Sequence, residues 1–216
     1  MAIILNNLLI VTAHPYTESF NFALRSHALT VFETANWKIT TSDLYQQAFN
    51  PLLGSDDFTQ FSDDAGFSLA GQQSAAYKAN TFHSAIKREH TKLLESDLII
   101  LQFPLWWGSF PAILKGWVER VLSYDFAYGA ENKLAGKSVM FSVTTGGAKN
   151  ISEEKYYADK IAAIESDVFN YLKMNILPTF ICHGPAKKNS QQRKQEIERL
   201  TLHLKDMQYY LLTSVA

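Results

Sequence analysis

Three short segments of the 216-residue chain carry residues that could hold a phosphate group and a flat aromatic ring. The first, AHPYTESFNFAL, places Ser19 in front of a helix-like pattern, with Thr17 and Asn21 close by. Serine caps helix N-termini, and the free N–H groups there bind phosphate. From this segment alone, a phosphate site and a simple helix cap are both open. It contains neither GxGxxG nor the GKS/GKT of a P-loop.

The second segment, FPLWWGSF, contains two adjacent tryptophans, Trp106 and Trp107, followed by Gly108. It comes directly after an apolar run, where a polar turn is the norm. Exposed indoles beside a glycine, which lets the backbone approach closely, predict a flat aromatic ligand. For one of the two tryptophans, packing on a neighbouring helix or in a dimer interface is an equal alternative.

The third segment, SVTTGGAKN, ends another apolar run in Gly146 and Gly147. Glycine has no side chain, so a planar ring system could lie directly against this backbone. A Gly-Gly pair alone is a weak signal, because many turns contain one. Three segments of compatible chemistry at one edge of a fold are a stronger signal than any of them singly.

The elements that must position these segments are predicted from hydrophobic patterning. Apolar runs without alternation, typical of strands buried on both faces, lie at Leu8–Thr12, Leu98–Phe103 and Ser138–Val143, and weaker strands at Lys38–Asp43 and Ile176–Cys182. Helical periodicity follows Ser19, covers about 82–95, follows Pro111 and runs from Ile197 to Leu211. This alternation predicts an α/β fold with a doubly wound, five-stranded parallel sheet of flavodoxin-like order 2-1-3-4-5. The three segments would meet outside the carboxyl ends of its strands, where such sheets bind ligands.

We expect residues 1–216 to form a single domain of this kind. The stretch Tyr45–Tyr77 is polar, lacks a clear period and is too long for a simple connection. It predicts an ordered excursion at about 45–80 that covers a site or a partner. A flexible loop is the alternative interpretation.

Composition excludes several classes of partner. A net charge of -1 gives no footprint for nucleic acid or an anionic membrane. The one cysteine, Cys182, excludes an internal disulfide and is typical of a reducing compartment. The apolar start of the chain lacks the basic region of a signal peptide, and no run approaches the roughly 20 apolar residues of a spanning helix. The histidines form no metal-binding pattern. We therefore expect a cytoplasmic protein with no metal site and no membrane insertion.

With these residues in view, the chain resembles the NAD(P)H:quinone oxidoreductase (DT-diaphorase) family of flavodoxin-like proteins. The matching motifs are HP…SFN at His14–Asn21, QFP…PAILKGW…ERV at Gln102–Val121, FAY at Phe126–Tyr128 and TTGG at Thr144–Gly147. The likeness spans roughly residues 8 to 147 and becomes faint beyond residue 150. It implies a homodimeric flavoprotein that carries FAD rather than FMN and transfers a hydride from NADH or NADPH to a quinone or another small aromatic acceptor.

The resemblance also implies roles for individual residues. The pyrophosphate and ribityl chain would be held by His14, Thr17, Ser19, Phe20 and Asn21. The isoalloxazine would be flanked by Pro104, Leu105, Trp106, Trp107 and Gly108, and by Thr144, Thr145, Gly146 and Gly147. Tyr128 would reach across the dimer to the substrate pocket, so that Tyr128, Gly146 and Gly147 stand at the catalytic end. Arg193 would lie near the adenosine.

Three departures from the family pattern leave its chemistry partly open. Trp106 replaces a position that is often glutamine, and Gly108 stands where the mammalian enzymes have a phenylalanine over the substrate pocket. The tyrosine and histidine that some members have soon after TTGG are missing at that spacing. Backbone N–H groups, Lys149 or Lys155 are the alternatives for their role.

Other functions on the same fold are also open. An azo- or nitro-reductase could use the same site, and some relatives are flavoprotein regulatory subunits of potassium efflux systems. An electron-carrier flavodoxin is disfavoured, because the near-neutral charge provides no acidic face for steering.

Overall fold

The computed structural model describes residues 7–61 and 68–214, so the apolar start of the chain and the middle of the predicted excursion lie outside the described residues. The strands are β1 (Asn7–Thr12), β2 (Lys38–Asp43), β3 (Leu98–Pro104), β4 (Ser138–Thr145), β5 (Asn175–Ile176) and β6 (Phe180–His183). The α-helices are α1 (Phe20–Thr34), α2 (Leu69–Ala79), α3 (Ser84–Glu95), α4 (Ala112–Val121), α5 (Ile151–Ile164) and α6 (Ser190–Ser214). Short helical turns lie at η1 (Ser55–Asp57), η2 (Glu165–Asn170) and η3 (Pro185–Lys187).

The sheet is parallel, with the order β2-β1-β3-β4-β5, which confirms the predicted order. The predicted fifth strand, Ile176–Cys182, is wrong in one respect, because it is divided into β5 and β6. Both pieces pair with β4. Strand β5 pairs with Ser138 and Val139, and β6 pairs with the carboxyl half of β4. Pro178 lies between them and has no N–H to donate, which accounts for the break. The consequence is that β6 ends beside the end of β4.

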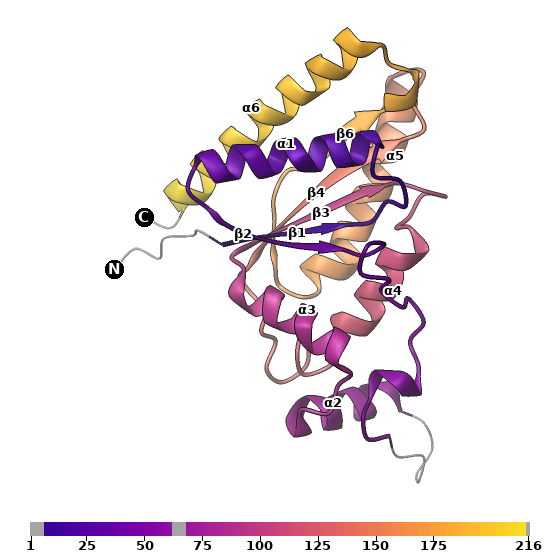
Figure 1. The fold of residues 1–216 in the computed structure, drawn as a ribbon, viewed down its shortest axis with the longest axis vertical. Helices are drawn as coiled ribbons and strands as arrows, with labels where there is room; N and C mark the ends of the chain where they lie inside the picture. The colour runs from indigo at the N-terminus through magenta and orange to yellow at the C-terminus, as the bar shows by residue number, and fades with distance from the viewer. Residues whose placement is uncertain (1–6, 62–67, 215–216) are drawn as a thin grey trace.

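Each central strand faces helices on both sides, which is why its apolar run does not alternate. Leu9 and Val11 of β1 belong to the core under α3, α4 and α5. Leu8 and Ile10 belong to the core under α1 and α6. Figure 1 shows α1 and α6 on one face of the sheet and α3 and α4 on the other. The predicted doubly wound architecture is therefore confirmed.

Two helices lie where no helix was predicted. In α5 only Ile161 is buried, and in α2 only Gln73 and Ala76 are. Helices that bury so few side chains have almost no apolar stripe, and the stripe is the signal that identifies a helix in a sequence. Among the described residues, no helix has the length and the apolar content needed to cross a membrane.

The first part of the excursion is fixed to α4. The buried guanidinium of Arg120 lies 2.6 Å from the carboxylate of Asp57, which is itself buried. A Cβ atom on Gly116 would stand 2.2 Å from the carbonyl oxygen of Pro51, so only glycine permits this close approach of α4 to the segment around Pro51. The helix that follows the Trp-Trp segment therefore also holds residues 50–57 in place.

Candidate active site

A cavity of about 360 Å³ opens at the carboxyl edge of the sheet, beyond β1, β3 and β4. The structure brings most of the predicted site residues together in its wall: His14, Ser19, Phe20, Asn21, Pro104, Leu105, Trp106, Thr144, Thr145, Gly146 and Arg193. The other lining residues, Glu18, Pro185 and Ala186, were not predicted. The walls thus come from the loops after β1, β3, β4 and β6 and from α6.

One end of the cavity is the N-terminus of α1. Ser19 caps this helix, since its hydroxyl accepts a hydrogen bond from the N–H of Phe22 at 3.4 Å. Nδ1 of His14 lies 3.1 Å from both backbone N and O of Tyr16, which leaves Nε2 as the nitrogen able to reach a ligand. Partial burial lowers the pKa of His14, because desolvation disfavours the imidazolium. Helix N–H groups and an imidazole N–H are suitable donors for a phosphate.

Asn21 has a different position from the one expected of a phosphate ligand. Its side chain is buried, and Nδ2 donates to the hydroxyl of Thr144 at 2.8 Å. Its Oδ1 accepts from Nε2 of Gln102, also at 2.8 Å. Both polar ends of the amide are therefore occupied, and Asn21 holds α1, β3 and β4 together. Gln102 was not predicted as a site residue, although a buried glutamine in the apolar run of β3 is a detectable signal.

The two glycines after β4 differ in what surrounds them. No atom lies within 4 Å of the position that a Cβ on Gly146 would take, and Gly146 lines the cavity. Gly147 has φ +129°, and the side chain of Lys187 and the backbone of Gly184 stand beside it. Gly147 does not line the cavity. Of the pair, Gly146 offers the bare backbone on which a planar ring could lie.

The two tryptophans are also separated. Trp106 lines the cavity with its side chain 41% exposed, and its ring centroid lies 5.9 Å from that of His14. Trp107 points away from the chain, is fully exposed and has φ +52°. Gly108 follows with φ +71° and does not line the cavity. Trp106 can therefore contact a ligand in the cavity of its own chain, whereas the indole of Trp107 is exposed to solvent.

Thr17 and Tyr128 are the remaining predicted residues that the cavity does not include. Tyr128 is half-buried in an aromatic cluster, with ring centroids 5.3 Å from Tyr124 and 5.8 Å from Tyr171. Burial raises the pKa of Tyr128, with the neighbouring tyrosines adding to the effect. Its hydroxyl therefore stays protonated near neutral pH.

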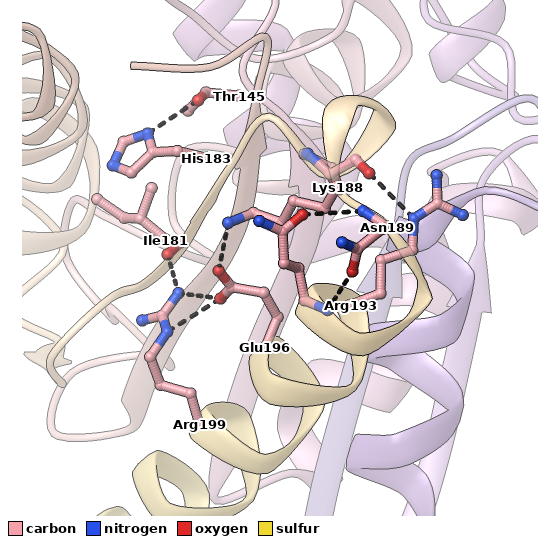
Figure 2. A network of polar contacts seen from close by, with 10 residues as sticks. Thr145, Ile181, His183, Lys188, Asn189, Arg193, Glu196 and Arg199 are labelled. Atoms are coloured by element: carbon pink, nitrogen blue, oxygen red, sulfur yellow. Dashed lines mark hydrogen bonds and ion pairs between the residues drawn. The ribbon is translucent and has the colours of Figure 1, made fainter. Parts of the chain in front are cut away.

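Another wall of the cavity is formed by η3 and α6, and Figure 2 shows the polar network around it. Nε of Arg193 donates to the carbonyl of Pro185 at 3.1 Å. Glu196 lies 2.8 Å from Lys188 and 2.6 Å from Arg199, and these two cations lower its pKa although burial opposes them. The hydrogen bond to Pro185 holds Arg193 at the cavity wall, and the ion pairs of Glu196 fix the next turn of α6.

The start of α6 is fixed by a reciprocal cap. The side chains of Asn189 and Gln192 each accept from the other's backbone N–H at 2.9 Å. This N-x-x-Q spacing is a capping box, which is the signal in the sequence that could have located the N-terminus of α6. No group of three or more potential metal ligands occurs in the described part of the chain.

Comparison with known proteins agrees with this geometry. The sequence pattern of the family described as "Flavodoxin-like fold" matches residues 6–204, and the chain belongs to that family. NAD(P)H dehydrogenase (quinone) 1 of Rattus norvegicus is 40% identical over 200 residues, which cover 88% of this chain and 73% of that protein. Human ribosyldihydronicotinamide dehydrogenase (quinone) is 32% identical, with coverage of 87% and 85%. Within the flavodoxin-like proteins, the chain therefore belongs to the NAD(P)H:quinone dehydrogenases.

Among solved structures, a quinone reductase candidate from Klebsiella pneumoniae superposes with a TM-score of 0.85 at 27% identity, covering 94% of this chain and 85% of the other. The likeness to known proteins does not end near residue 150, as the motifs alone suggested. It extends through β6, η3 and most of α6. Of these, η3 contributes Pro185 and Ala186 to the cavity, and α6 contributes Arg193.

Proposed function

We propose that this chain is a flavin-dependent NAD(P)H:quinone oxidoreductase whose flavin occupies the cavity beyond β1, β3 and β4. The observation that carries the proposal is that one cavity combines a capped helix N-terminus, an open glycine at Gly146 and an indole at Trp106. A phosphate, a planar ring and an aromatic contact are what a flavin nucleotide presents. The bound flavin would accept a hydride from NADH or NADPH and pass it to a quinone.

The residues of the chain supply binding and orientation in this proposal. The N–H groups at the start of α1 and Nε2 of His14 hold the phosphate, while Asn21 keeps α1 in register with β4. Gly146 and Leu105 provide the surfaces around the ring. The cavity also extends to Arg193 of α6, which offers a cation to the adenosine part of a dinucleotide. This extension is the reason to propose FAD in preference to FMN.

The proposal is tested on the purified protein. We expect a yellow solution with flavin absorption bands, FAD on chromatography of the released cofactor, and oxidation of NADH or NADPH that depends on added quinone. A colourless protein that binds neither FAD nor FMN on titration would overturn the proposal. Release of FMN would correct only the role given to Arg193.

We further propose a homodimer in which Tyr128 lines the substrate pocket of the other subunit. Its support is that Tyr128 lies outside the cavity of its own chain, in an aromatic cluster whose neighbour Tyr171 is exposed. Sedimentation should give twice the chain mass of 24.4 kDa. A fully active monomer at nanomolar concentration would contradict this assignment.

An azo- or nitro-reductase is the second candidate, and Gly108 favours it. Gly108 does not line the cavity, but a glycine beside the fully exposed Trp107 leaves the surface outside the cavity without a bulky second side chain, and that surface would admit larger flat acceptors. Turnover of an azo dye at a specificity constant above that for a simple benzoquinone would favour this candidate over the quinone reductase.

A further inference from the structure

The loop after β6 is fastened to the loop after β4 at the very edge of the candidate flavin site. Nδ1 of His183 lies 2.9 Å from the hydroxyl of Thr145, its partner at the end of the β4–β6 ladder (Figure 2). The N–H of Gly184 donates to the carbonyl of Thr145 at 3.0 Å. The Thr145 hydroxyl also accepts from the N–H of Gly147 at 3.3 Å. The contacts of His183 and Gly184 with Thr145 therefore hold the loop after β6 against the loop after β4.

A close contact between two glycines brings a lysine of η3 next to Gly147, at the rim of the cavity. A Cβ on Gly184 would lie 3.2 Å from Cα of Gly147, and Gly184 itself has φ +59°. The chain then turns through η3, and Nζ of Lys187 comes to 3.4 Å from the place that a Cβ on Gly147 would take. An ammonium group thus stands over Gly147, directly beside the open surface of Gly146.

The neighbouring cations are engaged elsewhere. Lys155 lies 2.8 Å from Asp159 of its own helix, and Lys188 lies 2.8 Å from Glu196. Arg193 donates to the carbonyl of Pro185. Lys149 is in the same loop as Gly147 but has no atom within 4 Å of either glycine's Cβ position. Within the described chain, Lys187 has no carboxylate at ion-pair distance.

We propose that Lys187 is the positive charge that stabilises the reduced flavin in this protein, an inference that rests on the proposed function. A hydride brings two electrons and one proton to a neutral ring system, so the ring gains one negative charge, which lies over its N1–C2=O edge. An ammonium beside the Gly146–Gly147 backbone favours that charged form and has little effect on the neutral oxidised form. Lys187 thereby takes over the role of the tyrosine and histidine that are missing soon after TTGG.

The test is the midpoint potential of the bound flavin in the holoprotein, measured for wild type, Lys187→Met, Lys187→Arg and Lys149→Met. Lys187→Met should bind oxidised flavin normally and reduced flavin about tenfold more weakly, which corresponds to a potential about 30 mV more negative for a two-electron couple. Lys187→Arg should retain the wild-type potential, because it keeps the charge. Lys149→Met should also leave it unchanged. Both side chains that are replaced, Lys187 and Lys149, are exposed, so the three variants should fold.

Each contrary result has a distinct meaning. An unchanged potential in Lys187→Met, or the same shift in Lys149→Met, would overturn the assignment to Lys187. An equal shift in Lys187→Met and Lys187→Arg would attribute the effect to loop structure, and would overturn it too. A wild-type protein that binds no flavin would instead refute the proposed function itself, so the two failures are distinguishable.

Discussion

Nδ2 of Asn21 lies 2.8 Å from the hydroxyl of Thr144, and this hydrogen bond joins the start of α1 to the end of β4. Both residues are buried, and Asn21 is also bonded to Gln102 of β3. Two buried hydrogen bonds thus hold α1, β3 and β4, which form three walls of the cavity, in position relative to one another.

The first prediction concerns that contact. Asn21→Ala leaves the amide of Gln102 and the hydroxyl of Thr144 without this partner, and an unsatisfied buried polar group costs about 1–3 kcal/mol. We expect a loss of unfolding free energy in that range for the apoprotein, measured by urea denaturation, together with weaker flavin binding.

Thr144→Val provides the matched control, because it removes the other end of the same hydrogen bond at similar volume. The double variant should lose less stability than the sum of the single variants, since both remove one interaction. Strict additivity would show that the Asn21–Thr144 contact is not energetically significant.

The second prediction separates the two glycines after β4. Gly146→Val fits the free chain, because its Cβ position is open, but it should meet a ring that lies on this backbone. Overpacking of a tight site costs about 1–3 kcal/mol, which is a loss in flavin affinity of roughly 5- to 150-fold. The apoprotein should melt at the wild-type temperature, and flavin titration should show the loss.

Gly147→Val is the comparison variant for that experiment. With φ +129°, Gly147 has a backbone conformation that valine strains to adopt, so we expect a lower melting temperature even without ligand. The sequence alone would direct the test to Gly147, where strain and ligand contact cannot be told apart. Wild-type flavin affinity in Gly146→Val would show that the ring lies elsewhere.

The third prediction distinguishes FAD from FMN. If Arg193 holds the adenosine end, Arg193→Gln should weaken FAD binding by up to about fivefold, because an exposed charge contact contributes at most about 1 kcal/mol. FMN binding should not change, because FMN lacks the adenosine that Arg193 would contact. Isothermal titration of the apoprotein with both nucleotides provides the measurement, and equal losses for FAD and FMN would refute the role of Arg193.

The part of the site that sequence predicts is the part built on local motifs. Ser19 before a helical pattern, the Trp-Trp-Gly segment and TTGG each mark the end of an apolar strand, so their convergence follows from a parallel sheet. The wall formed by η3 and the start of α6 is harder to predict from the sequence. The last strand was predicted as one piece, whereas the structure divides it at Pro178, and the residues after β6, Gly184 to Ala186, have no charge or pattern that indicates a site.

The orientation of neighbouring side chains is likewise a tertiary property. Trp106 and Trp107 are indistinguishable as residue types, yet a positive φ at Trp107 turns one indole outward while the other lines the cavity. The same limit applies to Asn21, whose engagement by Gln102 depends on a residue 81 positions away.

The last prediction concerns acid stability and a histidine remote from the cavity. His90 of α3 is buried, its ring stacks on Phe126 at a centroid distance of 3.7 Å, and Nε2 lies 2.8 Å from the carbonyl of Val121. Burial lowers the pKa of His90 from 6.5 to about 4, because the imidazolium would lose its hydration. Between those values the unfolded chain binds a proton that the folded chain does not, so the free energy of unfolding falls as the pH falls below 6.5. The slope is about 1.4 kcal/mol per pH unit, which gives a loss of about 2 kcal/mol between pH 7 and pH 5.

His90→Gln keeps an N–H donor for Val121 and has no charge to gain, so its urea-unfolding free energy should lack this part of the decline, whatever its value at pH 7. The exposed His83→Gln should keep the wild-type slope. If His90→Gln declines as steeply as wild type from pH 7 to pH 5, the acid sensitivity arises from other groups.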